Sequence, residues 1–381
     1  MNFKTISLVV MSLALFAMAS TACDVLGGGG TYKIGLLSPQ TGPIAVYAPG
    51  FEDAANVAIA ELNDNEDGNV FELVVADSGC DGTQAATAAQ TLIDSGVVGI
   101  VGAACSGATL GAIAVASEAG IPMVSYASTS PAVTSAEDNG YLFRVVPSDA
   151  QQAVALTAVV ADGGDSNPAV LYMTNDYGSG LADNFAANWS GAVCTTNAYD
   201  PTEGSYDAST IAQSVIDAGC DSAVLVSYAT DGAAIIEALK GQGFGGTIYG
   251  ADGIADAAFA SAFTDAAAVS GVIATKPRPG AESSAQSTFN SAYSAAGGDA
   301  EGIYTHETYD AINIIAHAAV EGSDDIRDDL ASVGSNYDGA SGVHSFDSNG
   351  DVAGTGYEVC QFDPAFTCTR VWTGSGGLAS Q

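Results

Sequence analysis

Residues 71–106 read FELVVADSGCDGTQAATAAQTLIDSGVVGIVGAACS, and this stretch decides the fold. The apolar, β-branched runs Phe71–Ala76 and Val97–Gly102 are typical of buried strands, and the Ala-rich residues 83–95 between them predict a helix. A strand, a helix and a second strand in this order form a βαβ unit. The stretch therefore predicts a parallel sheet covered by helices.

The same alternation continues outward from this unit. A first group of strands is predicted at Lys33–Leu37, Phe71–Ala76, Val97–Gly102, Pro122–Tyr126 and Tyr141–Val146, with helices near 48–64, 83–95 and 107–119. After Pro147 the alternation starts afresh, with strands at Ala169–Met173, Cys194–Tyr199, Ala223–Ser227, Thr247–Tyr249 and Gly271–Thr275 and helices near 149–162, 179–189, 207–218 and 231–241. The sequence thus predicts an α/β fold of two doubly wound parallel-sheet lobes.

The last hundred residues break this pattern. Lys276-Pro277-Arg278-Pro279 ends the alternation, and helices are predicted near 283–296 and 303–320. A strand at Ser341–Phe346 and a hairpin around Asp363-Pro364 follow. Two late helices followed by a hairpin suggest that the chain crosses back between the lobes.

The chain is strongly acidic. Its 381 residues include 8 Lys and Arg against 44 Asp and Glu, for a formal net charge of −36, although only 14% of the residues are charged. Such a field repels nucleic acids and anionic lipid surfaces, so we expect no nucleic-acid partner. Salt screens self-repulsion on this scale, so we expect a marine or halophilic source and a melting temperature that rises with salt. The alternative is an ordinary acidic secreted protein.

The amino terminus predicts export. Lys4 precedes the apolar run Ile6–Ala19, which is too short to span a bilayer but suits a signal peptide. Ser20-Thr21-Ala22-Cys23 resembles a bacterial lipobox, although Ser20 stands where Leu is usual, so cleavage by an ordinary signal peptidase near Ala22 is the alternative. We expect a signal peptide over 1–22, acylation of Cys23 as a membrane anchor, and a Gly-rich tether over 23–30.

The other six cysteines fit an oxidising compartment. An even number of cysteines outside the cytosol indicates disulfides, and their spacings do not suit a zinc site. Six cysteines allow 15 pairings. Because neighbouring cysteines fall at the ends of strands that should lie close together, we expect Cys80 with Cys105, Cys194 with Cys220, and Cys360 with Cys368.

Polar loops follow the carboxyl ends of the predicted strands, where open α/β sheets bind ligands. They are rich in Ser, Thr, Asp, Tyr and Gly and comprise Ser38–Tyr47, Asp77–Gly82, Ala104–Gly107, Ala127–Pro131, Asn175–Gly180, Tyr228–Asp231 and Asp252-Gly253. If the two lobes face each other, these loops line one cleft.

From about Ile34 to Trp372 these loops resemble those of the branched-chain amino-acid-binding (leucine/isoleucine/valine-binding) family of type I periplasmic binding proteins. The pieces that carry the resemblance are Thr41-Gly42-Pro43-Ile44-Ala45 with Tyr47, Asp77–Asp81, Gly102–Ser106, Ser125–Pro131, Asn175-Asp176-Tyr177-Gly178, Gly250-Ala251-Asp252-Gly253 and Thr308-Tyr309-Asp310-Ala311. The resemblance implies a clamshell with three hinge crossings, which we place near 145–148, 274–278 and 341–345. The first lobe would then hold 31–146 with 277–342, and the second 147–276 with 343–381.

The resemblance also implies a binding site and a disulfide that matches Cys80 with Cys105. Ser106 would hold the ligand carboxylate, and Ala127, Ser128 and Thr129 match a binding loop in which Thr129 touches both carboxylate and ammonium. Asp252 would face the ammonium, in a position where several relatives have Glu. Tyr47, Tyr177 and Tyr228 would cover the ligand.

The chemistry of these residues points the same way, because a zwitterion needs donors on one side and an acceptor on the other. Ser106 at a helix start supplies donors and a favourable dipole, and Asp252 supplies the acceptor. Plainer explanations exist: Ser106 and Thr129 could cap helices, Asp252 could form an Asp-Gly turn, and the tyrosines could lie on the surface.

The sequence favours a receptor that passes an amino acid or related small molecule to an ABC permease. A sensor or scavenger domain for amides, urea or small organic acids is the alternative, because one fold serves many ligands. GxSxG, HExxH and GxxxxGK are absent from the sequence, and His306, His317 and His344 are scattered, so we expect neither an enzyme nor a cofactor or metal. We expect a lipid-anchored, extracytoplasmic monomer.

Overall fold

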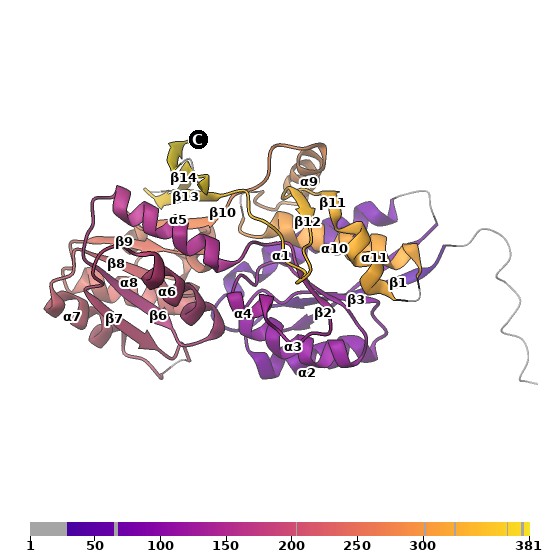
Figure 1. Ribbon diagram of the computed structural model, residues 1–381, viewed down its shortest axis with the longest axis horizontal. Coiled ribbons are helices and arrows are strands. Elements are labelled where there is room, and N and C mark those ends of the chain that lie inside the picture. The colour runs from indigo at the N-terminus through magenta and orange to yellow at the C-terminus, as the bar shows by residue number, and fades with distance from the viewer. Residues whose placement is uncertain are drawn as a thin grey trace, which may run out of the picture.

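The computed structural model describes residues 29–64, 68–202, 204–300, 302–323, 325–363, 365–374 and 377–381. The predicted signal peptide and the predicted acylation site at Cys23 lie outside these residues. Figure 1 shows two lobes side by side along the long axis of the molecule.

The first lobe contains a five-stranded parallel sheet. Its order is β2-β1-β3-β4-β5, formed by β1 (Thr31–Ser38), β2 (Val70–Asp77), β3 (Gly99–Val101), β4 (Met123–Ser125) and β5 (Leu142–Arg144). The connecting helices are η1 (Ala45–Tyr47), α1 (Ala48–Asn63), α2 (Gly82–Asp94), α3 (Ser106–Glu118) and α4 (Pro131–Thr134). In this order the winding direction reverses between β1 and β3, so the loops after these two strands border a crevice.

The second lobe contains an eight-stranded sheet of order β15-β14-β13-β10-β9-β8-β6-β7. The strands are β6 (Pro168–Met173), β7 (Thr195–Tyr199), β8 (Ser222–Val226), β9 (Thr247–Gly250), β10 (Ile273–Pro277), β13 (Tyr357–Phe362), β14 (Phe366–Trp372) and β15 (Leu378–Ser380). Its helices are α5 (Asp149–Asp162), α6 (Asp176–Asn188), α7 (Ala208–Ala218), α8 (Ala229–Gly241), η2 (Asp252–Ile254), η3 (Ala257–Ala262) and η4 (Ala266–Val269). The strands β6 to β10 are parallel as predicted, and β13 to β15 extend the sheet with antiparallel pairs.

Three helices return to the first lobe after β10, namely α9 (Ser284–Ala295), α10 (Thr305–Glu321) and α11 (Ile326–Val333). Helix α10 packs on α1 and on β1 and β3, so it completes the cover of the first sheet. A small antiparallel pair follows, β11 (Ser335–Asp338) with β12 (Val343–Ser345).

The chain crosses between the lobes three times. The first crossing lies between Arg144 at the end of β5 and Asp149 at the start of α5, and the second follows Pro277 at the end of β10. The third lies later than the range 341–345 expected from the sequence, because β12 pairs with β11 and Asp351 pairs with Arg144 of the first sheet. The chain joins the second sheet at Tyr357.

Local sequence explains how the site-bearing helices begin and pack. The side chain of Asp81 accepts hydrogen bonds from the amides of Thr83 and Gln84 and so caps α2. Helices α2 and α3 approach so closely that a Cβ at Gly111 would lie 2.1 Å from the carbonyl oxygen of Gly82. This packing fixes the amino end of α3, where Ser106 lies.

The three predicted disulfides are confirmed, joining Cys80 to Cys105, Cys194 to Cys220, and Cys360 to Cys368. The first ties the loop after β2 to the start of α3. Among the helices that the structure describes, none is long and apolar enough to cross a membrane.

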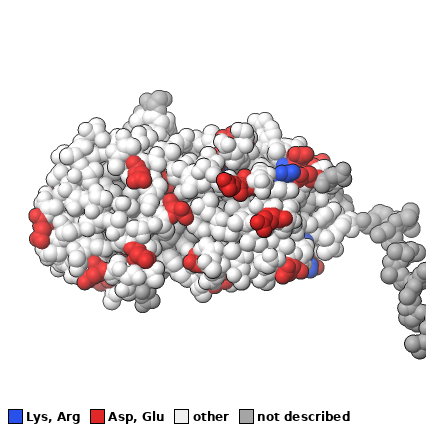
Figure 2. All heavy atoms as spheres, turned by 60° about the horizontal axis from the view of Figure 1, so that its bottom comes forward, with Lys and Arg blue, Asp and Glu red and all other residues white. Residues whose placement is uncertain are grey.

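The surface in Figure 2 carries scattered acidic side chains and few basic ones. This view agrees with the net charge of −36. The dependence of stability on salt stays a prediction.

Candidate functional site

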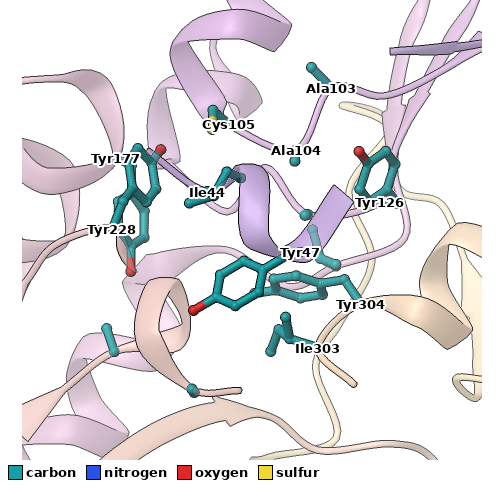
Figure 3. Packing of buried hydrophobic residues seen from close by; sticks show 14 of the residues in the cluster. Ile44, Tyr47, Ala103, Ala104, Cys105, Tyr126, Tyr177, Tyr228, Ile303 and Tyr304 are labelled. Atoms are coloured by element: carbon teal, nitrogen blue, oxygen red, sulfur yellow. The ribbon is translucent and has the colours of Figure 1, made fainter. Parts of the chain in front are cut away.

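A cavity lies between the lobes, with about 370 Å³ of space free of atoms when the adjoining open solvent is counted. Its walls are formed by Ile44, Tyr47, Phe51, Ala104, Ser106, Ala127, Tyr177, Tyr228, Asp252, Gly253, Ile303 and Tyr304. Most of these residues lie in the loops, or in the first turns of the helices, that follow the carboxyl ends of parallel strands, as the topology of the two sheets leads us to expect. Figure 3 shows Tyr177 and Tyr228 stacked at one side of the site, with Tyr47, Tyr304 and Ile303 at another.

The wall from the second lobe is built around Asp252, which begins η2 just after β9. Its carboxylate is 4% exposed and accepts hydrogen bonds from the hydroxyls of Tyr177, at 2.9 Å, and Tyr304, at 2.8 Å. Burial raises the pKa of Asp252, and the two hydroxyls oppose this shift by stabilising the charged form. A cation beside this carboxylate would be strongly favoured, because it would compensate the buried charge.

The tyrosines hold Asp252 and one another in place. Tyr177 and Tyr228 stack with ring centroids 5.3 Å apart and planes at 5°. The Tyr177 hydroxyl also accepts a hydrogen bond from the amide of Gly253, where a Cβ would lie only 2.4 Å from the carbonyl oxygen of Ser227. Burial, with Asp252 nearby, raises the pKa of Tyr177 and Tyr228 well above the usual value, so both remain neutral.

The wall from the first lobe supplies hydrogen-bond donors. Ser106 lines the cavity and is the first residue of the 13-residue helix α3, whose first amides have no acceptor within the helix. The Ser106 hydroxyl is buried and accepts a hydrogen bond from the Ser130 amide at 3.2 Å. Its proton is therefore free to be donated to a ligand, and the helix amino terminus favours a negative group there.

Six of the eight predicted binding residues line this cavity: Tyr47, Ser106, Ala127, Tyr177, Tyr228 and Asp252. All three tyrosines are buried, so the surface explanation for them is wrong. Ser106 does not cap α3 with its side chain, because Cys105 is the N-cap residue.

Ser128 and Thr129 are placed differently from the expectation, because their hydroxyls turn away from the cavity wall. The Ser128 hydroxyl lies 3.0 Å from the carbonyl oxygen of Ala103 and 2.7 Å from the hydroxyl of Thr109. The Thr129 hydroxyl donates to Asp149 at 3.0 Å. These two residues fix the shape of the loop that presents Ala127.

Asp149 is a second buried carboxylate beside the hinge. Burial and the charge of Asp252 raise its pKa, while the Thr129 hydroxyl and Arg144 favour its ionised form. One of its oxygens, Oδ1, is buried without a hydrogen-bond partner. A cation at this end of the site would favour the ionised form of both carboxyl groups, which burial opposes.

Several contacts hold the lobes together across the cleft. The amide and hydroxyl of Thr230 both donate to the carbonyl oxygen of Pro43, at 3.2 and 3.1 Å. The Ser130 hydroxyl donates to the carbonyl oxygen of Asp176 at 2.7 Å, and the Ile303 amide donates to Asp256 at 2.7 Å. The structure is therefore a closed form, in which the two lobes are in direct contact beside the cavity.

Sequence reasoning missed half of the wall: Ile44, Phe51, Ala104, Gly253, Ile303 and Tyr304. Ile44, Ala104 and Gly253 lie inside the polar loops predicted at the carboxyl ends of strands, so the loop pattern indicated their positions. No motif in the sequence indicates that Phe51, Ile303 and Tyr304 belong to the site. Tyr304 reaches the site because α10 packs back on the first lobe.

A cluster of Asp310, Ser341 and His344 has the residue types of a catalytic triad but another arrangement. Both the Ser341 hydroxyl and Asp310 Oδ2 contact the same ring nitrogen of His344, Nε2, at 2.9 Å. A proton relay needs the two partners on different nitrogens. Asp310 also accepts from the amides of Ala340 and Ser341, so the cluster anchors the loop before β12.

Comparison with known proteins agrees with this geometry. The chain is similar to the leucine-, isoleucine-, valine-, threonine- and alanine-binding protein of Pseudomonas aeruginosa, with 26% identity over 369 residues that cover 95% of this chain and 96% of that protein. It is 24% identical to the Leu/Ile/Val-binding protein of Escherichia coli over 377 residues, which cover 97% and 99%.

Among solved structures, the branched-chain amino acid transporter substrate-binding protein of Streptococcus pneumoniae, in complex with isoleucine, superposes with a TM-score of 0.79. The sequence identity is 25%, and the match covers 89% of this chain and 99% of that one. The family model described as periplasmic binding protein matches residues 31–365. The chain belongs to this periplasmic binding protein family.

Proposed function

We propose that this protein is the extracytoplasmic substrate-binding component of an ABC importer and that it binds an amino acid with a branched aliphatic side chain. The observation that carries the proposal is the cavity between the lobes, with the Asp252 carboxylate on one wall and Ser106 at the amino end of α3 on the other. These two groups match the opposite charges of a zwitterion.

The rest of the cavity supports an aliphatic side chain. With the ammonium at Asp252 and the carboxylate at Ser106, the side chain falls among Ile44, Phe51 and Ile303, which are buried and apolar. Burying an aliphatic side chain of this size contributes roughly 1.5 to 3 kcal/mol. The names of the similar proteins, which refer to leucine, isoleucine and valine and to a transporter, favour this function over a sensory one.

A thermal-shift and calorimetry screen tests the proposal. Leucine, isoleucine and valine are expected to stabilise the protein, by roughly 2.7 kcal/mol when present at about 100 times the dissociation constant. Acetamide, urea and isovalerate serve as controls that lack one or both charged groups. Stabilisation by one of these controls, with none by the three amino acids, would refute the proposed ligand class.

We also propose that the mature protein is a monomer anchored to the membrane by acylation of Cys23, with residues 23–30 as the lipidated tether. Removal of 1–22 would make Cys23 the new amino terminus. Cys23→Ser is expected to move the protein from the membrane fraction to the soluble one, because it removes the acylated thiol. Mass spectrometry of the mature protein checks this, and an unmodified terminus elsewhere would contradict it.

A further inference from the structure

A second cavity lies at the hinge, directly behind the ligand site. It holds about 600 Å³ of space free of atoms when the adjoining open solvent is counted, and Ile303 and Tyr304 line both cavities. Its walls come from both lobes, with Lys276 and Glu358 on the second sheet and His306 and Glu307 on α10. Ile303 and Tyr304 therefore form a partition that the two spaces share.

The two cavities differ in chemistry. The ligand site is apolar around Ile44, Phe51 and Ile303, whereas the hinge cavity contains two carboxylates, Glu307 and Glu358. Lys276 lies 3.7 Å from Glu358, and both side chains are about nine-tenths buried. His306 contacts Asn290 Oδ1 at 2.7 Å, and burial lowers its pKa to about 4, so it is neutral near pH 7. With Glu307 ionised, the hinge cavity has a net negative charge.

We propose that the Ile303 side chain determines ligand specificity: it closes the apolar pocket and separates the side chain of the bound amino acid from the acidic hinge cavity. The inference rests on the proposed function. A branched aliphatic side chain ends against Ile303. A lysine side chain in the same position would press its ammonium against this apolar wall, without a partner and away from water, and would be rejected.

Ile303 is suited to a direct test because its backbone and side chain have separate roles. Its amide donates to Asp256 at 2.7 Å and so helps to hold the lobes closed, and this contact survives a change of side chain. Ile303→Ala should open the partition toward Glu307. Ile44→Ala is the matched control, because Ile44 is equally buried and lines the ligand site but not the hinge cavity.

Calorimetry with isoleucine and lysine on wild type, Ile303→Ala and Ile44→Ala is the experiment. Both variants are expected to lose about tenfold in affinity for isoleucine, since each removes apolar contact. Only Ile303→Ala should gain affinity for lysine, by about tenfold or more, and Glu307→Gln in that background should abolish the gain. Burial raises the pKa of Glu307 to about 7, with Asp310 adding to the shift and His344 and Lys276 opposing it, so the titrations belong at pH 8.

The outcomes separate the two proposals. Two results would overturn this inference and leave the proposed function standing. In the first, wild type binds isoleucine but Ile303→Ala gains no affinity for lysine. In the second, Ile44→Ala gains as much affinity for lysine as Ile303→Ala. Failure of wild type to bind isoleucine would overturn the proposed function and this inference together. If Ile303→Ala does not fold, Ile303→Val should show a smaller change in the lysine-to-isoleucine ratio in the same direction, and an unchanged ratio would count against the inference.

Discussion

Asp252→Asn is expected to weaken the binding of leucine or isoleucine by roughly tenfold to a hundredfold, because a hydrogen bond to a charged group contributes about 1.5 to 3 kcal/mol and each factor of ten is about 1.4 kcal/mol. Asp252 is buried, and its oxygens already accept from Tyr177 and Tyr304, so the geometry for a third donor is set. The amide keeps the size of the side chain but removes the charge that compensates a buried ammonium.

The pH dependence of binding gives a second check on the same residue. Burial raises the pKa of Asp252, so the ionised form that the ammonium needs is lost as the pH falls through this raised pKa. Ligand affinity should therefore fall toward acid pH in wild type, and much less in Asp252→Asn.

Asp231→Asn is the matched control, because Asp231 is also a buried aspartate of the second lobe but bonds to Tyr199 and does not line the cavity. Ligands without an ammonium should bind Asp252→Asn with nearly the same affinity as wild type. Calorimetry that finds equal isoleucine affinity in wild type and Asp252→Asn would refute the assignment of the ammonium site.

The βα alternation made most of the fold predictable from the sequence. Each buried strand is a short apolar run, and parallel strands must be joined by crossovers, so the two sheets followed from the pattern. Strand β12 falls within the strand predicted at Ser341–Phe346, but its partner β11 was not predicted: Ser335–Asp338 is polar and largely exposed, so it has no apolar alternation that indicates a strand.

The site was predictable to the extent that topology determines it. Loops at the carboxyl ends of strands had to meet in the cleft, which placed Ser106, Tyr177 and Asp252 together. The directions of individual hydroxyls depend on neighbours that no local pattern specifies, as Thr129 shows by donating to Asp149. Tyr304 is the N-cap residue of α10, a helix that reaches the site through packing on residues far away in the sequence.

The position of the third crossing could not be predicted from local sequence for a similar reason. It depends on the contact between Arg144 and Asp351, which are 207 residues apart. Arg144 is fully buried, and its Nε and Nη2 donate to the two oxygens of Asp351 at 2.7 and 2.9 Å. Its Nη1 donates to the carbonyl oxygens of Ser128 and Ser130 at 3.1 and 3.0 Å. One side chain thus ties the segment after β12 to the loop that presents Ala127.

Arg144→Met is therefore expected to lower the free energy of unfolding by about 3 kcal/mol, because it leaves the partly buried carboxylate of Asp351 without its cation and two buried carbonyl oxygens without their donor. Arg370→Met is the control: Arg370 and Asp162 form an exposed ion pair, with side chains 36% and 51% exposed, and such pairs contribute about 1 kcal/mol or less. Urea denaturation, monitored by circular dichroism, measures the free energy of unfolding of both variants. Adding Asp351→Leu to Arg144→Met should restore part of the loss, because the carboxylate left without its cation is then removed. A loss no larger than that of Arg370→Met would show that Arg144 does not hold the third crossing in place.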